Sequence, residues 1–315
     1  MITRRHIRLK VMQSLYSYFS NKKNSSKELE KQLLESINET TKLHLSLLSF
    51  LIGLAQYFEV FITDSKKRYF PSESKLDADR SFLENRIVAQ IFSDKILMKN
   101  INLNSEEYLN NIDTDFYIDI FSKLFKSDLY IDYVNNPEKS FNDDKRFIIS
   151  VLDKHIINNQ KIQHLLYERS MYWRDDLPFI SSFLVSQINS LKKERKKILS
   201  FKSGFKNKED KVFALELYRK TIKLTDNFES IIIEKAKNWE LDRIAIMDQI
   251  LLKMSFTEIF EMQELPIKVS MNEYIEISKY YSTKKSSIFI NGILDSVVRD
   301  FNKKGKIKKS GKGLV

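Results

Sequence analysis

The chain has 315 residues with only 6 Gly and 4 Pro, and this composition excludes a disordered or collagen-like chain and disfavours a turn-rich β-sandwich. It contains no Cys, which excludes disulfide frameworks, thiolate metal sites and Cys nucleophiles and is typical of a reducing compartment. The net charge of +11 favours a polyanionic partner, with nucleic acid ahead of a membrane surface. Because the first ten residues lack the apolar core of a secretory signal, we expect a cytoplasmic, helical protein.

The excess positive charge is concentrated at the two ends of the chain. Residues 1–10 carry four cations, residues 303–315 carry six lysines, and neither segment contains an acid. Residues 11–302 therefore carry a net charge of only +1. The basic tail is typical of a disordered, solubilising end and equally of a contact with a polyanion, and the composition leaves both interpretations open.

A basic helix is predicted at the start of the chain. Apolar residues at helical spacing predict this helix over residues 3–19, and they are Ile7, Val11, Leu15 and Tyr18. Arg4 and Arg8 lie four residues apart, so they share a neighbouring face of the same helix. An ordered basic helix is better suited to recognising nucleic acid than a loose tail.

A long helix is predicted over residues 29–62, where apolar residues recur every three or four positions. Residues 43–62 raise the alternative of a membrane span, but six of these twenty positions are polar or Gly, and a buried bundle helix is favoured. His44 falls on the apolar face. We interpret it as a hydrogen-bonded core histidine, because no second His, Cys or acid stands beside it at metal-ligand spacing.

The middle of the chain is predicted to contain further helices, over residues 80–98, 106–126, 141–169 and 179–197. His155 lies on an apolar stripe and is predicted to be structural. Asp175 and Asp176 are compatible with a magnesium or general-acid site and with capping of the next helix, and capping is favoured. No metal site and no cofactor is predicted. Residues 201–210 are the best candidate for a linker.

The C-terminal third is predicted to form helices over residues 210–237, from Trp239 until Pro266 ends the apolar stripe, over residues 270–281 and over residues 288–295. Ser270 and Glu273 have the spacing of a capping box at the start of the third of these helices. Gly292 lies inside the last helix, where glycine costs about 1 kcal/mol relative to alanine. We therefore expect another helix to approach closely at Gly292.

Segments at both ends of the chain resemble the transcription antitermination protein NusB family. The resemblance rests on Arg4-Arg5-His6-Ile7-Arg8 with Val11 to Tyr16, on Trp239 to Glu258, on Pro266, on Val269 to Lys279, and on Ser286 with Phe289 to Asp295. It implies an all-α fold of two packed helical subdomains. We expect an enlarged N-terminal subdomain over residues 1–200, a NusB-like bundle over residues 209–302 and a basic tail over residues 303–315.

The resemblance implies a non-enzymatic, RNA-binding antitermination factor. Such a factor binds the boxA element of single-stranded rRNA leader transcripts together with NusE, a small-subunit ribosomal protein, and acts with RNA polymerase and other Nus factors. The residues that the resemblance assigns to RNA are Arg4, Arg5, Arg8, Tyr16, Lys284, Lys285 and Phe289. Asp248 and Lys253 occupy positions that face the partner.

This assignment suits unpaired RNA, because aromatic rings stack on exposed bases at about 1–3 kcal/mol per base and arginines contact phosphates. It requires the basic first helix and Phe289 to lie side by side. Without the resemblance, Phe289 would be interpreted as a core aromatic.

Two other function classes compete with this interpretation. One is a helical protein–protein scaffold in transcription or ribosome biogenesis. The other is an RNA-modifying enzyme, since NusB-like domains are also fused to some rRNA methyltransferases. The enzyme is disfavoured because the chain shows no Gly-rich turn of the cofactor-binding kind.

Overall fold

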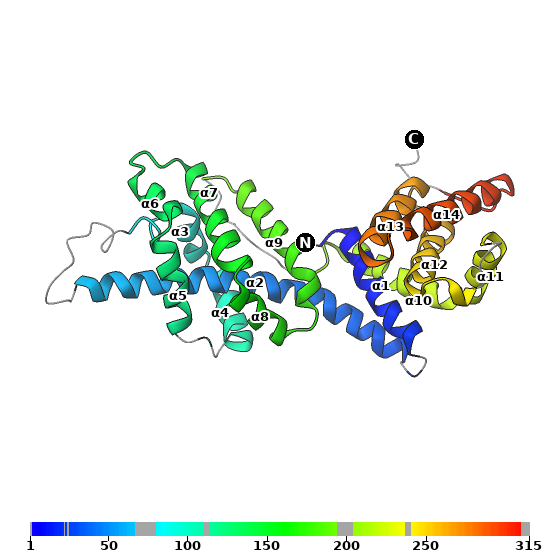
Figure 1. Ribbon diagram of the computed structural model, residues 1–315, viewed down its shortest axis with the longest axis horizontal. Coiled ribbons are helices and arrows are strands. Elements are labelled where there is room, and N and C mark those ends of the chain that lie inside the picture. Colours follow the sequence, from blue (N-terminus) through cyan, green and yellow to red (C-terminus); the bar gives the residue numbers. More distant parts are fainter. Residues whose placement is uncertain are drawn as a thin grey trace. The chain divides into compact units, whose positions relative to one another are not determined.

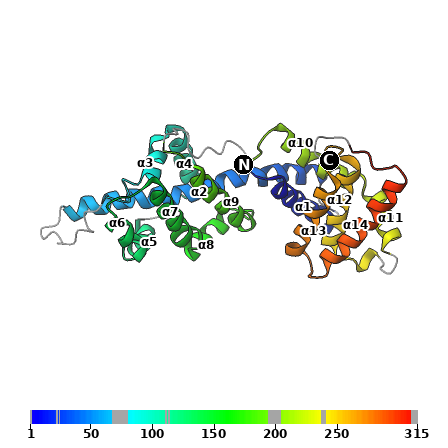
Figure 2. The same cartoon turned by 90° about the horizontal axis from the view of Figure 1, so that it is seen from above.

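The computed structural model describes residues 2–21, 23, 25–66, 80–109, 112, 114–193, 204–236 and 241–309. Within these ranges every regular element is a helix, which confirms the predicted all-α class. The helices belong to two compact units (Figures 1 and 2). We name residues 38–204 the inserted unit, and residues 2–37 together with 205–315 the terminal unit.

This division differs from the predicted boundary, which assigned residues 1–200 to one subdomain. The apolar face of α1 (Arg4–Ser20) is fully buried and packs on α10 (Lys208–Lys223) and α12 (Ile246–Glu261). The start of the chain therefore folds with the C-terminal helices. The predicted linker lies partly outside the described residues, and α10 already begins at Lys208.

The terminal unit is built around α12. Its other helices are α1, the first part of α2 (Ser26–Lys66), α10, α11 (Thr225–Lys235), α13 (Ile267–Tyr281) and α14 (Ser286–Lys303), with a short 3₁₀ turn at Leu241–Arg243. Residues 250–259 of α12 are all buried, and α12 packs against α1, α10, α11, α13 and α14. A helix that is buried on all sides forms the centre of a bundle.

The inserted unit gathers its helices around residues 38–66 of α2 (Figure 1). These helices are α3 (Arg86–Ser93), α4 (Lys95–Tyr108), α5 (Thr114–Phe125), α6 (Asp128–Asn135), α7 (Phe141–Val151), a π-helical turn (Leu152–Ile157), α8 (Gln160–Arg169) and α9 (Trp173–Ser190). Aromatic rings fill much of the core, with Phe58 lying 4.7 Å from Phe82 and 4.6 Å from Phe121 between ring centroids. A Cβ atom on Gly53 would come 2.2 Å from the Tyr117 hydroxyl, so α5 approaches α2 closely there.

α2 is long and apolar enough to cross a membrane by composition alone, with a window of mean hydropathy 1.8. However, 61% of that window is buried inside the protein. These are also the properties of a core helix in a helical bundle, which is the interpretation that the sequence favoured.

Several predicted helices are interrupted by short polar residues. The Asp94 carboxylate accepts hydrogen bonds from the amides of Ile96 and Leu97, and it starts α4 inside the predicted helix 80–98. Asn159 starts α8 in the same way. Asp and Asn bind nearby backbone amides, which ends one helix and begins another without disturbing the apolar period.

The prediction that a helix begins after Pro178 is wrong, because α9 begins at Trp173 and contains this proline. Asp175 and Asp176 therefore occupy the first turn of α9 rather than a loop before it. Negative charge there complements the helix dipole. No group of three or more His, Asp or Glu side chains that could hold a metal occurs among the described residues.

His44 is buried in the inserted unit, as the sequence predicts. Its Nε2 lies 2.8 Å from Oε1 of Gln187 on α9. Burial lowers the pKa of His44 to about 4, below its ordinary value of 6.5. The imidazole is therefore neutral in the folded protein at neutral pH.

We expect His44 to make the stability of the inserted unit depend on pH. Because the pKa is lower in the folded state, the unfolded chain binds the proton first as pH falls from 6.5 towards 4. The free energy of unfolding should fall by about 3 kcal/mol over this range from His44 alone. Urea unfolding of wild type and His44→Gln between pH 4 and 7 measures the difference in slope, with His164→Gln as the exposed control. Equal slopes for wild type and His44→Gln would contradict the assignment.

Candidate RNA-binding site

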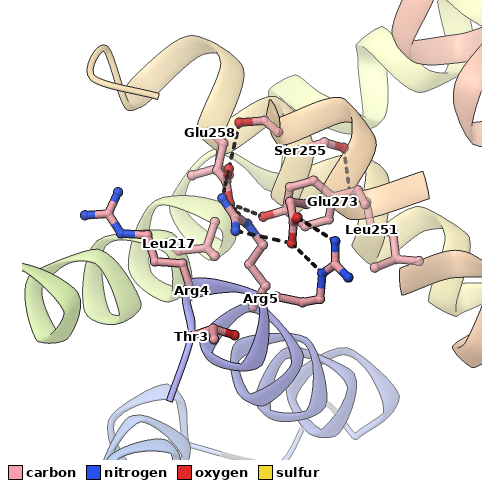
Figure 3. A network of polar contacts seen from close by, with 12 residues as sticks. Thr3, Arg4, Arg5, Leu217, Leu251, Ser255, Glu258 and Glu273 are labelled. Atoms are coloured by element: carbon pink, nitrogen blue, oxygen red, sulfur yellow. Dashed lines mark hydrogen bonds and ion pairs between the residues drawn. The ribbon is translucent and has the colours of Figure 1, made fainter. Parts of the chain in front are cut away.

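The arginines at the start of α1 all reach carboxylates on other helices, and Figure 3 shows the contact between Arg5 and Glu273. The ion pairs are Arg4 with Asp210 of α10, Arg5 with Glu273 of α13, and Arg8 with Glu258 of α12. Thr3 fixes the start of the helix, because its hydroxyl accepts a hydrogen bond from the His6 amide. These contacts join α1 to three helices of the terminal unit.

Arg8 is buried, with only 3% of its side chain exposed. Its Nε and Nη2 donate to the two oxygens of Glu258 at 2.7 and 2.8 Å, and the hydroxyls of Ser270 and Tyr274 donate to the same carboxylate at 2.7 and 2.6 Å. Burial acts to lower the pKa of Arg8, but Glu258 outweighs it and raises the pKa above its ordinary value. The predicted contact of Arg8 with RNA is not favoured by this arrangement, because the guanidinium is enclosed and already bonded.

The predicted capping box at Ser270 and Glu273 is also wrong. α13 begins earlier, at Ile267, directly after Pro266. Ser270 donates to Glu258 and Glu273 pairs with Arg5, so both side chains make contacts between helices instead of capping their own.

Arg5 remains at the surface, with 55% of its side chain exposed. Its Nε and Nη2 donate to Glu273 at 2.9 and 2.7 Å. The hydrogen bonds to Glu273 raise the pKa of Arg5, and the same bonds lower the pKa of Glu273. A phosphate that binds Arg5 must therefore compete with a carboxylate.

Arg4 lies in surroundings that disfavour a phosphate. Its Nε is 3.2 Å from Asp210 and its guanidinium carbon lies 5.2 Å from the centre of the Phe213 ring. Arg4 and Lys208 line a cleft of about 530 Å³ together with four carboxylates, those of Glu209, Glu216, Glu261 and Glu264. The local charge is therefore negative in spite of the basic chain.

The turn between α13 and α14 presents Lys284 and Lys285, and both side chains are exposed. Asp248, at the start of α12, holds this turn in place. Its carboxylate accepts hydrogen bonds from Ser282 at 2.6 Å and from Ser286 at 2.7 Å. The two lysines therefore project from an ordered turn.

Phe289 is half-buried one turn into α14. It lines a cleft of about 280 Å³ together with Arg243, Ile244, Asp248 and Lys285. The ring is thus neither a fully enclosed core residue nor a freely exposed platform, and the cleft gives it an open side.

Arg5 and Phe289 belong to the same unit, but the partners of the arginines are separated along α12 and α13 from the residues that hold the turn before Phe289. On α12, Glu258 beside Arg8 follows Asp248 by ten residues, or about 15 Å along the helix axis. On α13, Glu273 beside Arg5 precedes Ser282 by nine residues, or about 13 Å. The side-by-side arrangement that the prediction required is therefore not found.

The predicted partner residues also have internal partners. Only 3% of the Lys253 side chain is exposed, its Nζ lies 2.7 Å from Glu229 of α11, and it lies 4.4 Å from the centre of the Phe19 ring. Asp248 is buried beneath the two serines that it binds. Direct contact of these side chains with a partner remains a prediction, which the burial of Lys253 does not favour, whereas Asp248 lines the cleft beside Phe289.

Sequence reasoning missed two exposed side chains beside the lysine turn. Tyr280, at the end of α13, is 82% exposed, and Ile288, at the start of α14, is 76% exposed. Tyr16 on α1 is exposed as well. Their position on either side of the Lys284-Lys285 turn could have identified Tyr280 and Ile288 as candidates. The spacing of apolar residues alone does not show which side chains are exposed.

Gly292 does not pack against another helix as predicted. A Cβ atom at this position would meet nothing within 4 Å, so the face of α14 that carries Gly292 is open. Gly292 follows Phe289 by three residues, so this open face lies about one turn further along α14.

Part of the basic tail folds back onto α12. The Lys309 ammonium donates to the backbone carbonyls of Glu258 and Met262, both at 2.8 Å. These carbonyls belong to the end of α12, where a cation is favourable. Burial lowers the pKa of Lys309 to about 8. Lys309 thus has a structural contact, whereas residues 310–315 lie outside the described residues.

The fold and this surface define the class of the terminal unit: an all-α bundle around a buried central helix, with exposed lysines and an aromatic at one turn. The sequence model of the NusB family matches residues 181–299. The chain belongs to the NusB family.

Three relatives of the chain bear the name "Transcription antitermination protein NusB". The protein of Salinibacter ruber is 44% identical over 103 residues, which are 33% of this chain and 64% of that protein. That of Chloroherpeton thalassium is 43% identical over 105 residues, 33% of this chain and 50% of that protein. That of Thermodesulfovibrio yellowstonii is 36% identical over 116 residues, 37% of this chain and 77% of that protein.

The chain therefore spans between half and two thirds of the first two relatives. Their name describes transcription antitermination and not catalysis, in agreement with the prediction that the chain is not an enzyme. No solved structure matches the chain.

We expect Arg8 to stabilise the fold rather than bind RNA. Arg8→Ala would leave Glu258 buried without its counter-charge, and such a loss lowers the free energy of unfolding by about 3–5 kcal/mol. Arg219→Ala is a matched control, because Arg219 makes the same two-pronged pair with Glu30 but is 60% exposed. The control should lose less than about 1 kcal/mol. Urea unfolding of the full chain measures both, and a near wild-type value for Arg8→Ala would contradict a structural role.

Proposed function

We propose that this chain is a non-enzymatic, RNA-binding transcription antitermination factor that binds boxA-type single-stranded rRNA leader RNA. The observation that carries the proposal is the ordered turn of Lys284 and Lys285 between the exposed Tyr280 and the half-buried Phe289. Membership of the NusB family supports it.

The chemistry of this turn fits an unpaired strand. Lys284 and Lys285 supply a salt-sensitive contact with phosphates, and the Tyr280 and Phe289 rings offer faces on which bases stack. Stacking on an aromatic ring needs a base that is not paired. A double helix would conceal these bases, so the surface favours single-stranded RNA.

Arg5 extends the proposed contact along α13. Its partner Glu273 precedes the lysine turn by about 13 Å along the axis of α13, so one strand that follows α13 can reach both. Arg5 and the lysines then bind different phosphates of the same RNA. Tyr16 on α1 is a further exposed ring that we include in the proposed RNA contact. Arg4 and Arg8 contribute through their contacts with α10 and α12.

We further propose NusE, the small-subunit ribosomal protein, as the partner, with RNA polymerase and other Nus factors joined indirectly. The cleft lined by Arg243, Ile244 and Phe289 lies beside the Asp248 position that the family resemblance assigns to the partner. In this proposal Asp248 acts by fixing the turn of the cleft through Ser282 and Ser286.

We expect the double variant Lys284→Ala/Lys285→Ala to bind boxA-type RNA more weakly and with a smaller dependence on salt. Removing one lysine–phosphate interaction with a single strand reduces the slope of log K against log salt by about 0.7. Fluorescence anisotropy at several salt concentrations, with and without the ribosomal protein, measures both quantities. The control is Lys303→Ala/Lys304→Ala, an adjacent lysine pair at the other end of α14. Equal effects in both variants would indicate nonspecific electrostatic attraction. No RNA binding by the wild-type protein would favour the alternative function, a helical protein–protein scaffold.

We expect Glu273→Gln to tighten RNA binding, because it removes the carboxylate that competes for Arg5. An exposed ion pair of this kind contributes up to about 1 kcal/mol. We therefore expect Glu273→Gln to change the affinity for RNA by up to about fivefold. Arg5→Ala should change the affinity in the opposite direction. Glu30→Gln and Arg219→Ala alter the corresponding exposed pair and should leave RNA binding unchanged. Weaker binding by Glu273→Gln would show that the pair itself, rather than the free arginine, supports the contact.

A further inference from the structure

The inserted unit contains a cavity of about 330 Å³ where α5, the π-helical turn and the start of α8 meet. Its lining residues are Ile120, Lys123, Lys154, His155, Asn158, Asn159, Gln160 and Lys161. The cavity lies outside residues 181–299, the part that matches the NusB family, and the RNA contact proposed above does not involve it.

The cavity is lined by three lysines and by no carboxylate. Lys123 and Lys161 come from different helices, and both lie close to Asp119, at 3.2 and 3.1 Å. The carboxylate of Asp119 therefore shows that an oxyanion can bridge these two ammonium groups. Lys154 has no hydrogen-bond or ion-pair partner among the described residues. Its charge is available to a ligand.

Three polar side chains join the lysines in the lining, those of Asn158, Asn159 and Gln160. The Asn158 side-chain amide already donates to the Asp153 carboxylate and that of Asn159 to the His155 carbonyl, whereas Gln160 has no hydrogen-bond partner among the described residues. The cavity also includes the first residues of α8, where the Asn159 side chain accepts hydrogen bonds from the backbone amides of Lys161 and Ile162. In the π-helical turn the backbone amide of Asn158 donates to the backbone carbonyl of Asp153. Lys154 and Asn158 of this turn both line the cavity.

The lysines around the cavity affect the pKa of His155. His155 is half-buried, and burial lowers its pKa, with further lowering by the charges of Lys154 and Lys123. The imidazole is therefore neutral at neutral pH and can donate one N–H to an oxygen acceptor without adding charge. The sequence interpreted this histidine as structural, but it borders a cationic cavity.

We propose that this cavity binds a phosphate group, carried either by an RNA strand or by a small phosphorylated molecule. Lys123 and Lys161 approach from two sides around Asp119, Lys154 adds an unpaired cation, and Gln160 supplies a further donor. A volume of 330 Å³ accommodates a phosphate with part of an attached sugar but not a folded domain. The inference does not depend on the RNA contact at the terminal unit.

The test titrates inorganic pyrophosphate into the full chain and follows the imidazole NMR signal of His155, which His155→Gln assigns. A saturable shift is expected for wild type. Lys154→Ala should weaken binding about tenfold, because it removes one charged donor. Lys126→Ala is the matched control, since this exposed lysine also belongs to the α5 region but does not line the cavity. Its affinity should equal that of wild type.

Two further titrations identify the source of the phosphate. Uridine monophosphate and a single-stranded RNA decamer are each added to the Lys284→Ala/Lys285→Ala chain, in which the proposed terminal contact is weakened. Saturation by the nucleotide supports a small ligand, and saturation by the decamer alone supports an RNA strand. The proposal is overturned if no probe shifts His155, if sodium chloride at equal ionic strength shifts it equally, or if Lys126→Ala weakens binding as much as Lys154→Ala. Failure of RNA binding at the terminal unit leaves the pyrophosphate result unaffected.

Discussion

The buried carboxylate of Glu258 is the interaction on which the terminal unit depends. It receives hydrogen bonds from Arg8 of α1 and from Ser270 and Tyr274 of α13, and its own backbone carbonyl receives Lys309. A buried charge is tolerated only when it is paired and its remaining lone pairs are bonded, and here both conditions hold. One residue thus fixes the first helix through its side chain, and the tail through its backbone carbonyl, against the centre of the bundle.

The all-α class and the buried face of α1 were predictable, because both follow from apolar residues at helical spacing. His44 was predictable for the same reason. The helix breaks at Asp94 and Asn159 were not, since these residues end a helix by binding nearby amides while the apolar pattern continues. The misassigned capping box shows the converse case. Ser270 and Glu273 have the local spacing of a cap, but more favourable partners reach them from distant parts of the chain.

The candidate site was predictable as a set of residue types but not as a geometry. Arg4, Arg5 and Arg8 look equivalent in sequence, yet one faces an acidic cleft, one is exposed and one is buried. The difference arises from carboxylates more than 200 positions away, which periodicity cannot locate. The resemblance to the family identified the lysine turn, but only the structure shows that Tyr280 stands beside it exposed.

The pair of Arg8 with Glu258 joins residues separated by 250 positions, whereas the inserted unit is continuous in sequence between them. During synthesis, residues 38–204 leave the ribosome as a complete set and can fold while the rest of the chain is still being made. α1 is synthesised before these residues and α12 after them. Arg8 therefore cannot form its pair with Glu258 until the whole inserted unit has been synthesised.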